Sequence, residues 1–551
     1  MDRQEDEMST SQDTVRAYHE RSKHQLRRYA AGPETLDWDA QPDPFRRWAG
    51  SSLTMLPLVA ASIGTTWSEL HGDVAPLGIS RETIGALFEL SFGLTAWKQL
   101  GPDRWALRAN PSSGNLHPTE AYLLAAQVRD LADGLYHYAP KEHALELRTP
   151  LVASDPNGAP QLWIGLSSIC WREAWKYGER AFRYCQLDTG HALGALRYAA
   201  ATLGWQARVV THIGHAELAA LLGLDREMDF GTAEAEEPEV LVQIGPHLPL
   251  QLVVPRGWTN TDHWQGRANR LDVHPMYRWP VIEEVAVATR DAGGASPADS
   301  TPEPSRPAQA RVAAKADRPA VELILQRRSA QHFESAATMS MGAFLRIVES
   351  LQPCPGLPWD TMPSAPLVHA VMYVHRVDGL PPGAYVLPRS ASGADLLSGA
   401  LTAGRAWEAV SQVPPGVPLQ RLASPSRLAE TLRTLSCHQA IARDACFAVS
   451  LVAEVGTVFS GSPSGYRQLF RECGLIGQVL YLAAEAEGYR GTGIGCYFDD
   501  AVHEFLGLAD QRLQVLYHFT VGAPLSDTRI SLEAPYADRS PITASQDPLA
   551  P

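Results

Sequence analysis

The most distinctive polar segment of the chain is residues 110–122, which read N-P-S-S-G-N-L-H-P-T-E-A-Y. Pro111 fixes one φ angle and Gly114 frees another. The small hydrogen-bonding side chains of this loop are Ser112, Ser113 and Asn115. Such a loop can hold a flat ring with polar edges against exposed amides and hydroxyls. An ordinary turn ahead of a strand is the alternative, and composition alone favours it.

A candidate phosphate site, Q-R-R-S at 326–329, lies at the end of a helix-like run at 320–326. The guanidinium groups of Arg327 and Arg328 can form paired hydrogen bonds with a phosphate, and the Ser329 hydroxyl can add another. The solvated cationic end of a helix is the alternative. Arg529, in G-A-P-L-S-D-T-R, is a weaker candidate for a further phosphate contact.

A glycine-rich run at 491–495, G-T-G-I-G, follows a long helical pattern. The residues that would let backbone amides approach a ligand closely are Gly491, Gly493, Ile494 and Gly495. A dinucleotide fingerprint needs a strand before the glycines and a helix opening at them, so this run does not predict a Rossmann fold. A plain glycine loop is the alternative.

The best catalytic candidates are Lys176 and Tyr177, in the segment W-R-E-A-W-K-Y-G-E-R-A-F-R-Y. A lysine whose pKa is lowered by burial, or a tyrosine acidified by a neighbouring cation, could accept a proton. Arg180 and Arg183 could instead bind an acidic substrate. A cationic helix face with its aromatic side packed is the remaining alternative.

Hydrophobic periodicity predicts the elements that must position these groups. Ser80 is the expected N-cap of one helix, and a long buried helix is expected to end at Gly204. The expected strands are 121–128, 134–138, 162–166 and 240–244.

The composition is that of a globular protein with an ample core, since 45% of the 551 residues are hydrophobic and 20% are charged. The net charge of −14 argues against nucleic acid or an anionic membrane as the main partner. The 7 cysteines form no C-x-x-C pair and the 18 histidines no H-E-x-x-H, so we expect no metal and a reduced, cytoplasmic setting. No signal peptide or membrane span is expected.

Two halves repeat each other in register. Gly190 and Gly204 are 14 residues apart, as are Gly474 and Gly488. In each half an L-G-L triplet begins 18 residues after the second glycine. The expected divisions are an extension at 1–60, a domain at 61–285, a Pro/Ala-rich linker at 286–318, a second domain at 319–535 and a tail at 536–551.

The P-S-S-x-N-x-x-P loop and the R-R-S motif resemble those of the nitroreductase superfamily of flavoproteins, and the longer context at 108–138 resembles its SagB-type (azoline dehydrogenase) branch. The amino-terminal arm is similar to that branch's extension. The resemblance implies an α+β fold with two tandem domains, each a mixed sheet flanked by long helices, joined as an intrachain pseudo-dimer. It also implies FMN, held by the R-R-S phosphate motif, the ring-edge loop and the G-T-G-I-G amides. FMN is expected rather than FAD because the one phosphate site visible in the sequence is a single arginine pair.

The azoline oxidases of this branch carry a Lys-Tyr pair that Lys176 and Tyr177 match. The implied function is a dehydrogenase or oxidase that passes a hydride from a small-molecule or peptide-derived substrate to flavin N5, with dioxygen restoring the flavin. One alternative is an NAD(P)H-dependent nitro, quinone or ene reductase, which would need no side-chain base. The other is a flavin-free partner subunit. Further oligomerisation is left open.

Alignment of the two halves indicates one composite site. The second half has D-T-M-P-S (360–364) where the first has P-S-S-G-N, and the first has W-S-E (67–69) where the second has R-R-S. Because each half keeps what the other has lost, we expect one FMN per chain.

Overall fold

The computed structural model describes residues 2–151, 158–252, 255–259, 262–293, 317–362, 364–401, 407–414, 416–423, 426–508, 510–537 and 539. Most of the expected linker at 286–318 and of the expected tail at 536–551 lies outside these residues.

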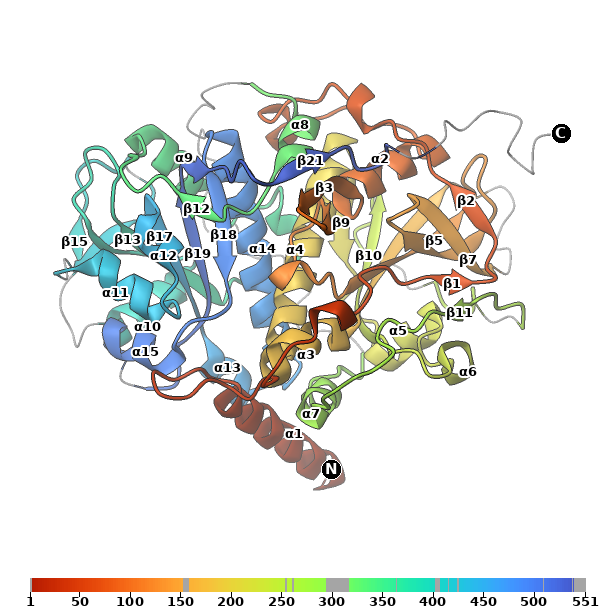
Figure 1. Ribbon diagram of the computed structural model, residues 1–551, viewed down its shortest axis with the longest axis horizontal. Helices are drawn as coiled ribbons and strands as arrows, with labels where there is room; N and C mark the ends of the chain where they lie inside the picture. Colours follow the sequence, from red (N-terminus) through yellow and green to blue (C-terminus); the bar gives the residue numbers. More distant parts are fainter. Residues whose placement is uncertain are drawn as a thin grey trace.

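The first half forms, among the described residues, a seven-stranded sheet with helices packed against it (Figure 1). Its strands in spatial order are β2 (Leu53–Met55), β7 (Ala144–Pro150), β6 (Gly134–Ala139), β5 (Thr119–Ala126), β8 (Gln161–Ser168), β10 (Glu237–Gly245) and β9 (Gln206–Val209). Its helices are α2 (Arg81–Ser91), α3 (Cys170–Tyr177), α4 (Ala181–Thr202), α5 (His215–Leu222), α6 (Glu227–Phe230) and α7 (Pro280–Ala288). A separate short pair joins β1 (Trp48–Ala49) to β11 (Arg267–Ala268).

The second half repeats this design in the described part of the chain. Its seven strands in spatial order are β15 (Glu408–Ala409), β16 (Gln420–Ala423), β14 (Gly383–Leu387), β13 (Val368–Val374), β17 (Phe447–Ala453), β19 (Gln514–Gly522) and β18 (Arg490–Ile494). Its helices are α8 (Ala320–Gln326), α9 (Met341–Ser350), α10 (Ala391–Ala400), α11 (Leu428–Leu435), α12 (Ala440–Asp444), α13 (Val455–Ser460), α14 (Gly465–Ala486) and α15 (Asp499–Leu506). β12 (His332–Phe333) pairs with β20 (Pro524–Leu525) beside it.

The tandem α+β fold is therefore confirmed, because each strand of one sheet has a counterpart at the same place in the other. The expected helix start at Ser80 also forms, with the Ser80 side chain accepting a hydrogen bond from the Thr83 amide. The pairings described in both large sheets are antiparallel rather than mixed. In the first sheet the reason is that β10 lies between β8 and β9 and runs opposite to both.

The two halves meet where the long helices α4 and α14 cross at equivalent glycines. A Cβ atom on Gly190 would lie 2.1 Å from the carbonyl oxygen of Arg471, and one on Gly474 would lie 2.0 Å from that of Leu187. Leu187 and Arg471 each precede their own glycine by three positions. This reciprocity is the signature of a twofold interface, here within one chain, and it requires glycine because the backbones touch.

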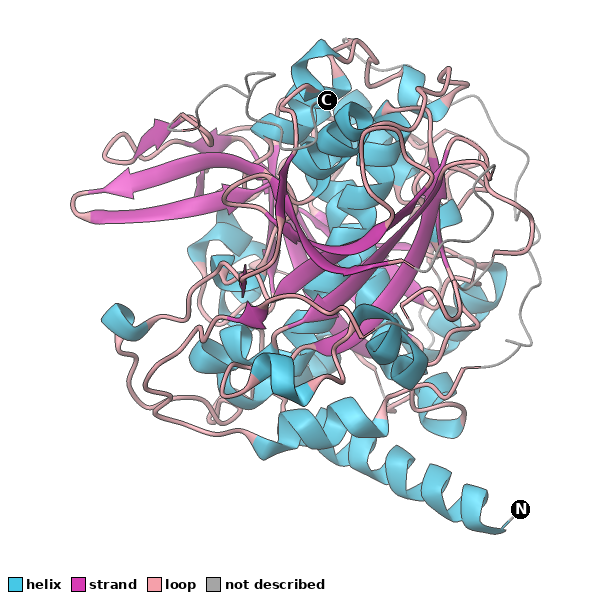
Figure 2. Ribbon diagram, turned by 90° about the vertical axis from the view of Figure 1, so that its right-hand side faces the viewer, coloured by secondary structure: helices cyan, strands magenta, loops and turns pink. Residues whose placement is uncertain are grey.

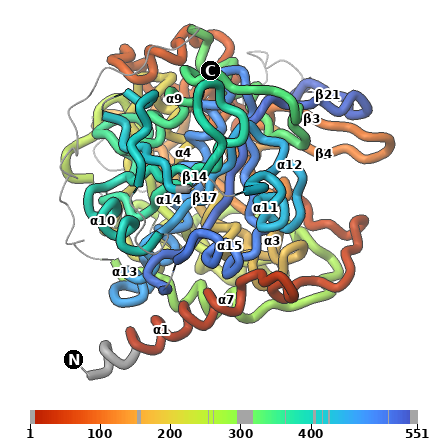
Figure 3. Tube along the Cα trace, turned by 90° about the vertical axis from the view of Figure 1, so that its left-hand side faces the viewer, coloured from red at the N-terminus to blue at the C-terminus, as the bar shows by residue number. Residues whose placement is uncertain are grey.

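Both ends of the described chain bind the halves together. Tyr18 of α1 (Asp2–Arg21) packs its ring against Phe182 of α4 at 5.7 Å and against Tyr466 of α14 at 6.3 Å between ring centroids. At the other end β21 (Ser531–Glu533) pairs with β3 (Leu94–Leu100), which pairs with β4 (Asp103–Arg108). The β3–β4 hairpin projects from the body of the molecule, whereas α1 extends along its base (Figures 2 and 3). The extension at 1–60 thus contacts both halves rather than one.

Candidate active site

A cavity of about 340 Å³ lies between the two halves and gathers most of the residues that the sequence singled out. The first half supplies the loop at 110–115, Tyr177, residues of α4 and part of the β3–β4 hairpin. The second half supplies residues 327–329 and the stretch 492–496. Both halves therefore contribute lining residues to this one cavity.

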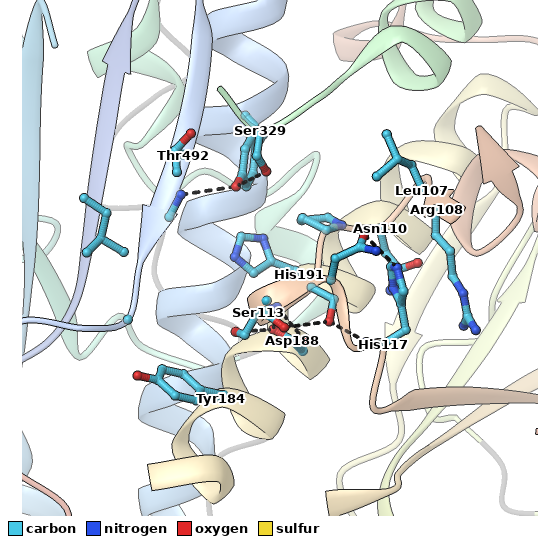
Figure 4. A pocket seen from close by; sticks show the side chains of 18 of the residues that line it. Leu107, Arg108, Asn110, Ser113, His117, Tyr184, Asp188, His191, Ser329 and Thr492 are labelled. Atoms are coloured by element: carbon cyan, nitrogen blue, oxygen red, sulfur yellow. Dashed lines mark hydrogen bonds between the residues drawn. The ribbon is translucent and has the colours of Figure 1, made fainter. Parts of the chain in front are cut away.

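The loop at 112–117 is held rigidly in a turned conformation. Gly114, Asn115 and His117 have φ angles of 60°, 61° and 52°, which lie in the left-handed region. The Ser112 hydroxyl accepts a hydrogen bond from the His117 amide at 2.8 Å, and the Asn115 side-chain amide donates to the Ala106 carbonyl at 2.9 Å. These bonds fix the loop, whose Ser113 and His117 line the cavity (Figure 4).

Asp188, on α4, anchors this loop and was not predicted from the sequence. Its carboxylate accepts hydrogen bonds from the amide and hydroxyl of Ser113 at 2.9 to 3.1 Å, and the two side chains face each other in Figure 4. Burial raises the pKa of the Asp188 carboxyl to about 7, although the bonds from Ser112 and Ser113 lower it. The signal that could have identified it is that Asp188 is the one acidic residue of α4, whose sequence is otherwise largely apolar.

Asp188→Asn is expected to make stability less dependent on pH. Because its folded pKa of about 7 is raised above the ordinary 3.8, the folded protein keeps a proton that the unfolded chain loses. The free energy of unfolding therefore falls as pH rises between these two values, by at most about 1.4 kcal/mol per pH unit. Urea unfolding should show that the free energy of unfolding of the variant, relative to that of the wild type, is larger at pH 8 than at pH 5. Parallel pH dependences for variant and wild type would contradict this, and the exposed carboxyl control Asp510→Asn should show no such gain.

Three cations lie in the lining of the cavity. Arg327 is buried and donates from Nε to the Ala109 carbonyl and from Nη2 to the Arg108 carbonyl. Arg328 Nη2 donates to the Thr95 carbonyl of β3, at 3.0 Å. Lys98, on the same hairpin, is the third cation, and no motif in the sequence pointed to it.

These cations destabilise one another in their charged forms. Burial lowers the pKa of Lys98, and the charges of Arg328, Arg490 and Arg327 lower it further. Burial, Arg327 and Arg490 likewise lower the pKa of Arg328 to about 10. A bound anion would relieve this repulsion, so the cluster suits a phosphate.

The glycine-rich run forms an edge strand, β18, rather than the plain loop that was its alternative reading. Gly491 and Gly493 pair with Val521 and Phe519 of β19. A Cβ atom on Gly493 would lie 1.8 Å from the Tyr517 hydroxyl oxygen, so glycine lets that side chain reach the cavity wall. The lining includes Gly493, Ile494 and Gly495, whereas Gly491 lies behind it against the Phe519 ring.

Tyr177 lines the cavity and lies against the loop. A Cβ atom on Gly114 would come within 2.5 Å of the Tyr177 hydroxyl oxygen. Burial and the Glu173 carboxyl raise the pKa of Tyr177 well above its ordinary value, so the phenol is not acidified as the sequence suggested. Burial lowers the pKa of Lys176, and its Nζ lies 5.4 Å from the centroids of both the Tyr177 and the Trp38 rings. Lys176 itself lies beside the lining rather than in it.

The other cations considered from the sequence form ion pairs outside the cavity lining. Arg180 and Arg183 are buried and form ion pairs with Asp499 at 3.1 and 2.8 Å, so they do not present charge to an acidic substrate. Arg529 is exposed and pairs with Asp527 at 2.7 Å, away from the cavity.

The equivalent position on the other side of the pseudo-twofold axis is filled by side chains. Arg197 forms a double hydrogen bond with Asp360, whose position aligns with Pro111, at 2.8 and 2.9 Å. Trp67, which aligns with Arg327, stacks on Tyr198 with ring centroids 5.6 Å apart. An ion pair and a stacked indole thus stand where phosphate cations and a ring-edge loop would be needed.

Within the described residues, no cluster of three or more His, Cys, Asp or Glu side chains could hold a metal ion. The described helices also include none long and apolar enough to cross a membrane.

Comparison with known proteins agrees with this architecture. A structure from Anabaena variabilis ATCC 29413, provisionally named a nitroreductase, matches with a TM-score of 0.66 and 21% identity, covering 93% of this chain and 99% of its own. A Ralstonia eutropha JMP134 structure, also provisionally named a nitroreductase, covers 41% of this chain and 98% of its own at 16% identity; its TM-score of 0.24 supports no argument. No curated protein matches the chain. The model of the nitroreductase family matches residues 76–240 and 405–523, which is more than half of the chain, and the protein therefore belongs to the nitroreductase family.

Proposed function

We propose that the protein is an FMN-dependent dehydrogenase or oxidase that uses the cavity between its two halves. The observation that carries this proposal is the pairing, in one cavity, of a cationic end with a rigid polar loop. One end suits a phosphate and the other the polar edge of a flat ring, as FMN requires.

Buried polar atoms without hydrogen-bond partners among the described residues support the fit. In the lining they are Arg108 Nε, Asn110 Oδ1, His117 Nδ1 and Arg328 Nε. An unsatisfied buried polar group costs about 1–3 kcal/mol, so a polar ligand that reached these atoms would be stabilised. They include both donors and an acceptor, as the edge of an isoalloxazine ring needs.

Each set of residues has a separate task in this proposal. Arg327, Arg328 and Ser329 would hold the phosphate, joined by Lys98 from the hairpin. Ser112, Ser113 and Asn115 would bind the ring edge, and the backbone at 493–495 would approach the ring from the other half. Bound FMN would supply a hydride acceptor at N5. Because these groups come from both halves, the site exists only in the assembled pseudo-dimer.

Lys176 and Tyr177 would handle the proton that leaves the substrate with the hydride. The lowered pKa of Lys176 makes its amine the better acceptor of the two. Tyr177 keeps its proton at neutral pH, so its hydroxyl would orient the substrate or pass a proton on. The expected substrates are azoline-type rings in peptide-derived or other natural products, with dioxygen as electron acceptor.

The experiment that tests this function compares two reactions of the FMN-loaded full chain. With a thiazoline-containing peptide and dioxygen, mass spectrometry should show loss of two hydrogens from the peptide. Rapid bleaching of the flavin by NADH or NADPH without air, with no change in the peptide, would instead identify an NAD(P)H-dependent reductase.

Each chain is expected to bind one FMN. The second position is closed by the Arg197–Asp360 pair and by Trp67, so a second flavin would have to displace a paired charge and a stacked ring. The ratio of flavin absorbance to protein mass, measured on protein saturated with FMN and freed of excess, checks this. A ratio near two would contradict it. Arg197→Ala should leave the ratio unchanged, because the phosphate cations are missing from that side.

A further inference from the structure

Two cysteines that the proposed reaction does not use lie together in the cavity wall. Cys496 directly follows Gly495 and lines the cavity, and Cys437 lies two residues after the end of α11. Their segments are joined by a hydrogen bond from the Phe498 amide to the Leu435 carbonyl at 2.9 Å. The Gln439 side chain also donates to the Cys496 carbonyl at 3.2 Å. These bonds place Cys437 beside Cys496, close enough for each thiol to shift the pKa of the other.

The amino-terminal extension supplies a histidine to this pair. The Ala30 amide donates to Nδ1 of His24 at 2.9 Å, so in the neutral ring the proton must lie on Nε2. Burial lowers the pKa of His24, which keeps the ring neutral. The His24 side chain is also a neighbour of Cys496, and its Nε2–H is the group that can donate to the sulfur. Cys496 thus has both His24 and Cys437 beside it.

The charged groups around the pair favour a thiolate at Cys496. Arg180 donates from Nε and Nη2 to the Gly495 carbonyl, beside the sulfur, while Asp499 faces Arg180 and the His24 amide. The neighbouring Cys437 thiol, with help from His24 and Arg180, lowers the pKa of Cys496 to about 5 despite burial. Cys496 and burial raise the pKa of Cys437, where the Tyr29 hydroxyl is a further neighbour.

We propose that Cys437 and Cys496 form a second redox centre, a reversible dithiol–disulfide couple with Cys496 as the nucleophile. The Cys496 thiolate attacks a small-molecule disulfide, forms a mixed disulfide and releases one thiolate. Cys437 then loses its proton and attacks the Cys496 sulfur, which closes the intramolecular disulfide and releases the second thiolate. Two protein thiols are oxidised and one disulfide is reduced to two thiols.

This couple gives the extension at 1–60 a chemical role, because His24 orients and activates a cysteine of the second half. It also places a two-electron thiol centre in the wall of the cavity that we assign to the flavin. The centre does not depend on that assignment, since its chemistry needs only a thiol–disulfide buffer.

The test is to equilibrate the reduced full chain with mixtures of glutathione and glutathione disulfide, trap free thiols by alkylation, and map the peptides by mass spectrometry. We expect a Cys437–Cys496 cross-link that dithiothreitol reverses. Cys437→Ser should instead leave a persistent glutathione adduct on Cys496, because the resolving thiol is gone. The matched control is Cys170→Ser, since Cys170 is also a neighbour of a cysteine, Cys185, whose charged neighbours are carboxylates. It should leave the cross-link unchanged.

A pH profile separates this activated pair from two cysteines that are merely close. Alkylation of Cys496 in the Cys437→Ser variant should rise with a midpoint well below the ordinary thiol pKa of about 8.5. His24→Ala in that background should raise the midpoint by about one unit or more. Any of three results would overturn the proposal. Both Cys437 and Cys496 could remain open to alkylation in excess glutathione disulfide, the glutathione adduct could form on Cys437 instead, or the alkylation of Cys496 could have an ordinary midpoint.

Discussion

Replacing Arg327 and Arg328 together with alanine is expected to weaken FMN binding by about 10²- to 10⁴-fold. A hydrogen bond to a charged group contributes about 1.5–3 kcal/mol, and each arginine would supply at least one to the phosphate. The loss should not exceed this simple sum, because Lys98 and Ser329 remain in the lining to bind the phosphate. Equilibrium titration of the apoprotein, followed by flavin fluorescence, gives the two dissociation constants.

Lysine substitutions serve as a graded comparison. Arg327→Lys/Arg328→Lys keeps the charge but loses the planar donor pair, so its affinity should lie between those of the alanine variant and the wild type. The control Arg256→Ala removes an exposed arginine that pairs with Glu217 and should leave the affinity unchanged. An alanine variant that unfolds at the wild-type temperature and still binds FMN with wild-type affinity would show that the phosphate lies elsewhere.

Lys176→Ala is expected to slow substrate oxidation by about 10²- to 10⁴-fold without loss of flavin, the usual contribution of a positioned proton acceptor. Lys176 lies beside the cavity lining, so its removal should not disturb the cofactor contacts. Tyr177→Phe should have a smaller effect, because the raised pKa of Tyr177 keeps its phenol protonated. The measurement is the rate of flavin reduction by an azoline substrate in a single turnover without oxygen, at equal flavin content.

The pH dependence of the same reaction separates an acceptor lysine from a structural one. The rate should rise with pH to a plateau set by a midpoint below the ordinary lysine value, and Lys176→Ala should remove that midpoint. Variants of both residues that keep nearly full rates would rule out the pair as proton acceptors and favour a reductase that needs no side-chain base.

The sequence by itself determined the groups that act over short distances along the chain. The turned conformation of the loop at 110–115 follows from Pro111 and Gly114, and the helix start follows from Ser80. Comparison of the two halves also predicted one composite site, because aligning two copies of one domain shows which binding residues each copy has kept and which it has lost. Gly190 of α4 and Gly474 of α14 allowed the two halves to be aligned. Both positions remain glycine because the touching backbones leave no room for a Cβ atom.

The tertiary structure alone decided features that depend on which distant segments meet. The run at 491–494 becomes an edge strand because β19 lies beside it, although its composition suits a loop. Tyr177 keeps its proton because Glu173 and burial outweigh any neighbouring cation, and a sequence does not show burial. His24 meets Cys496 only because the extension folds over the second half. Each of these outcomes rests on burial or on contacts between segments far apart in the chain, whose energies no local pattern encodes.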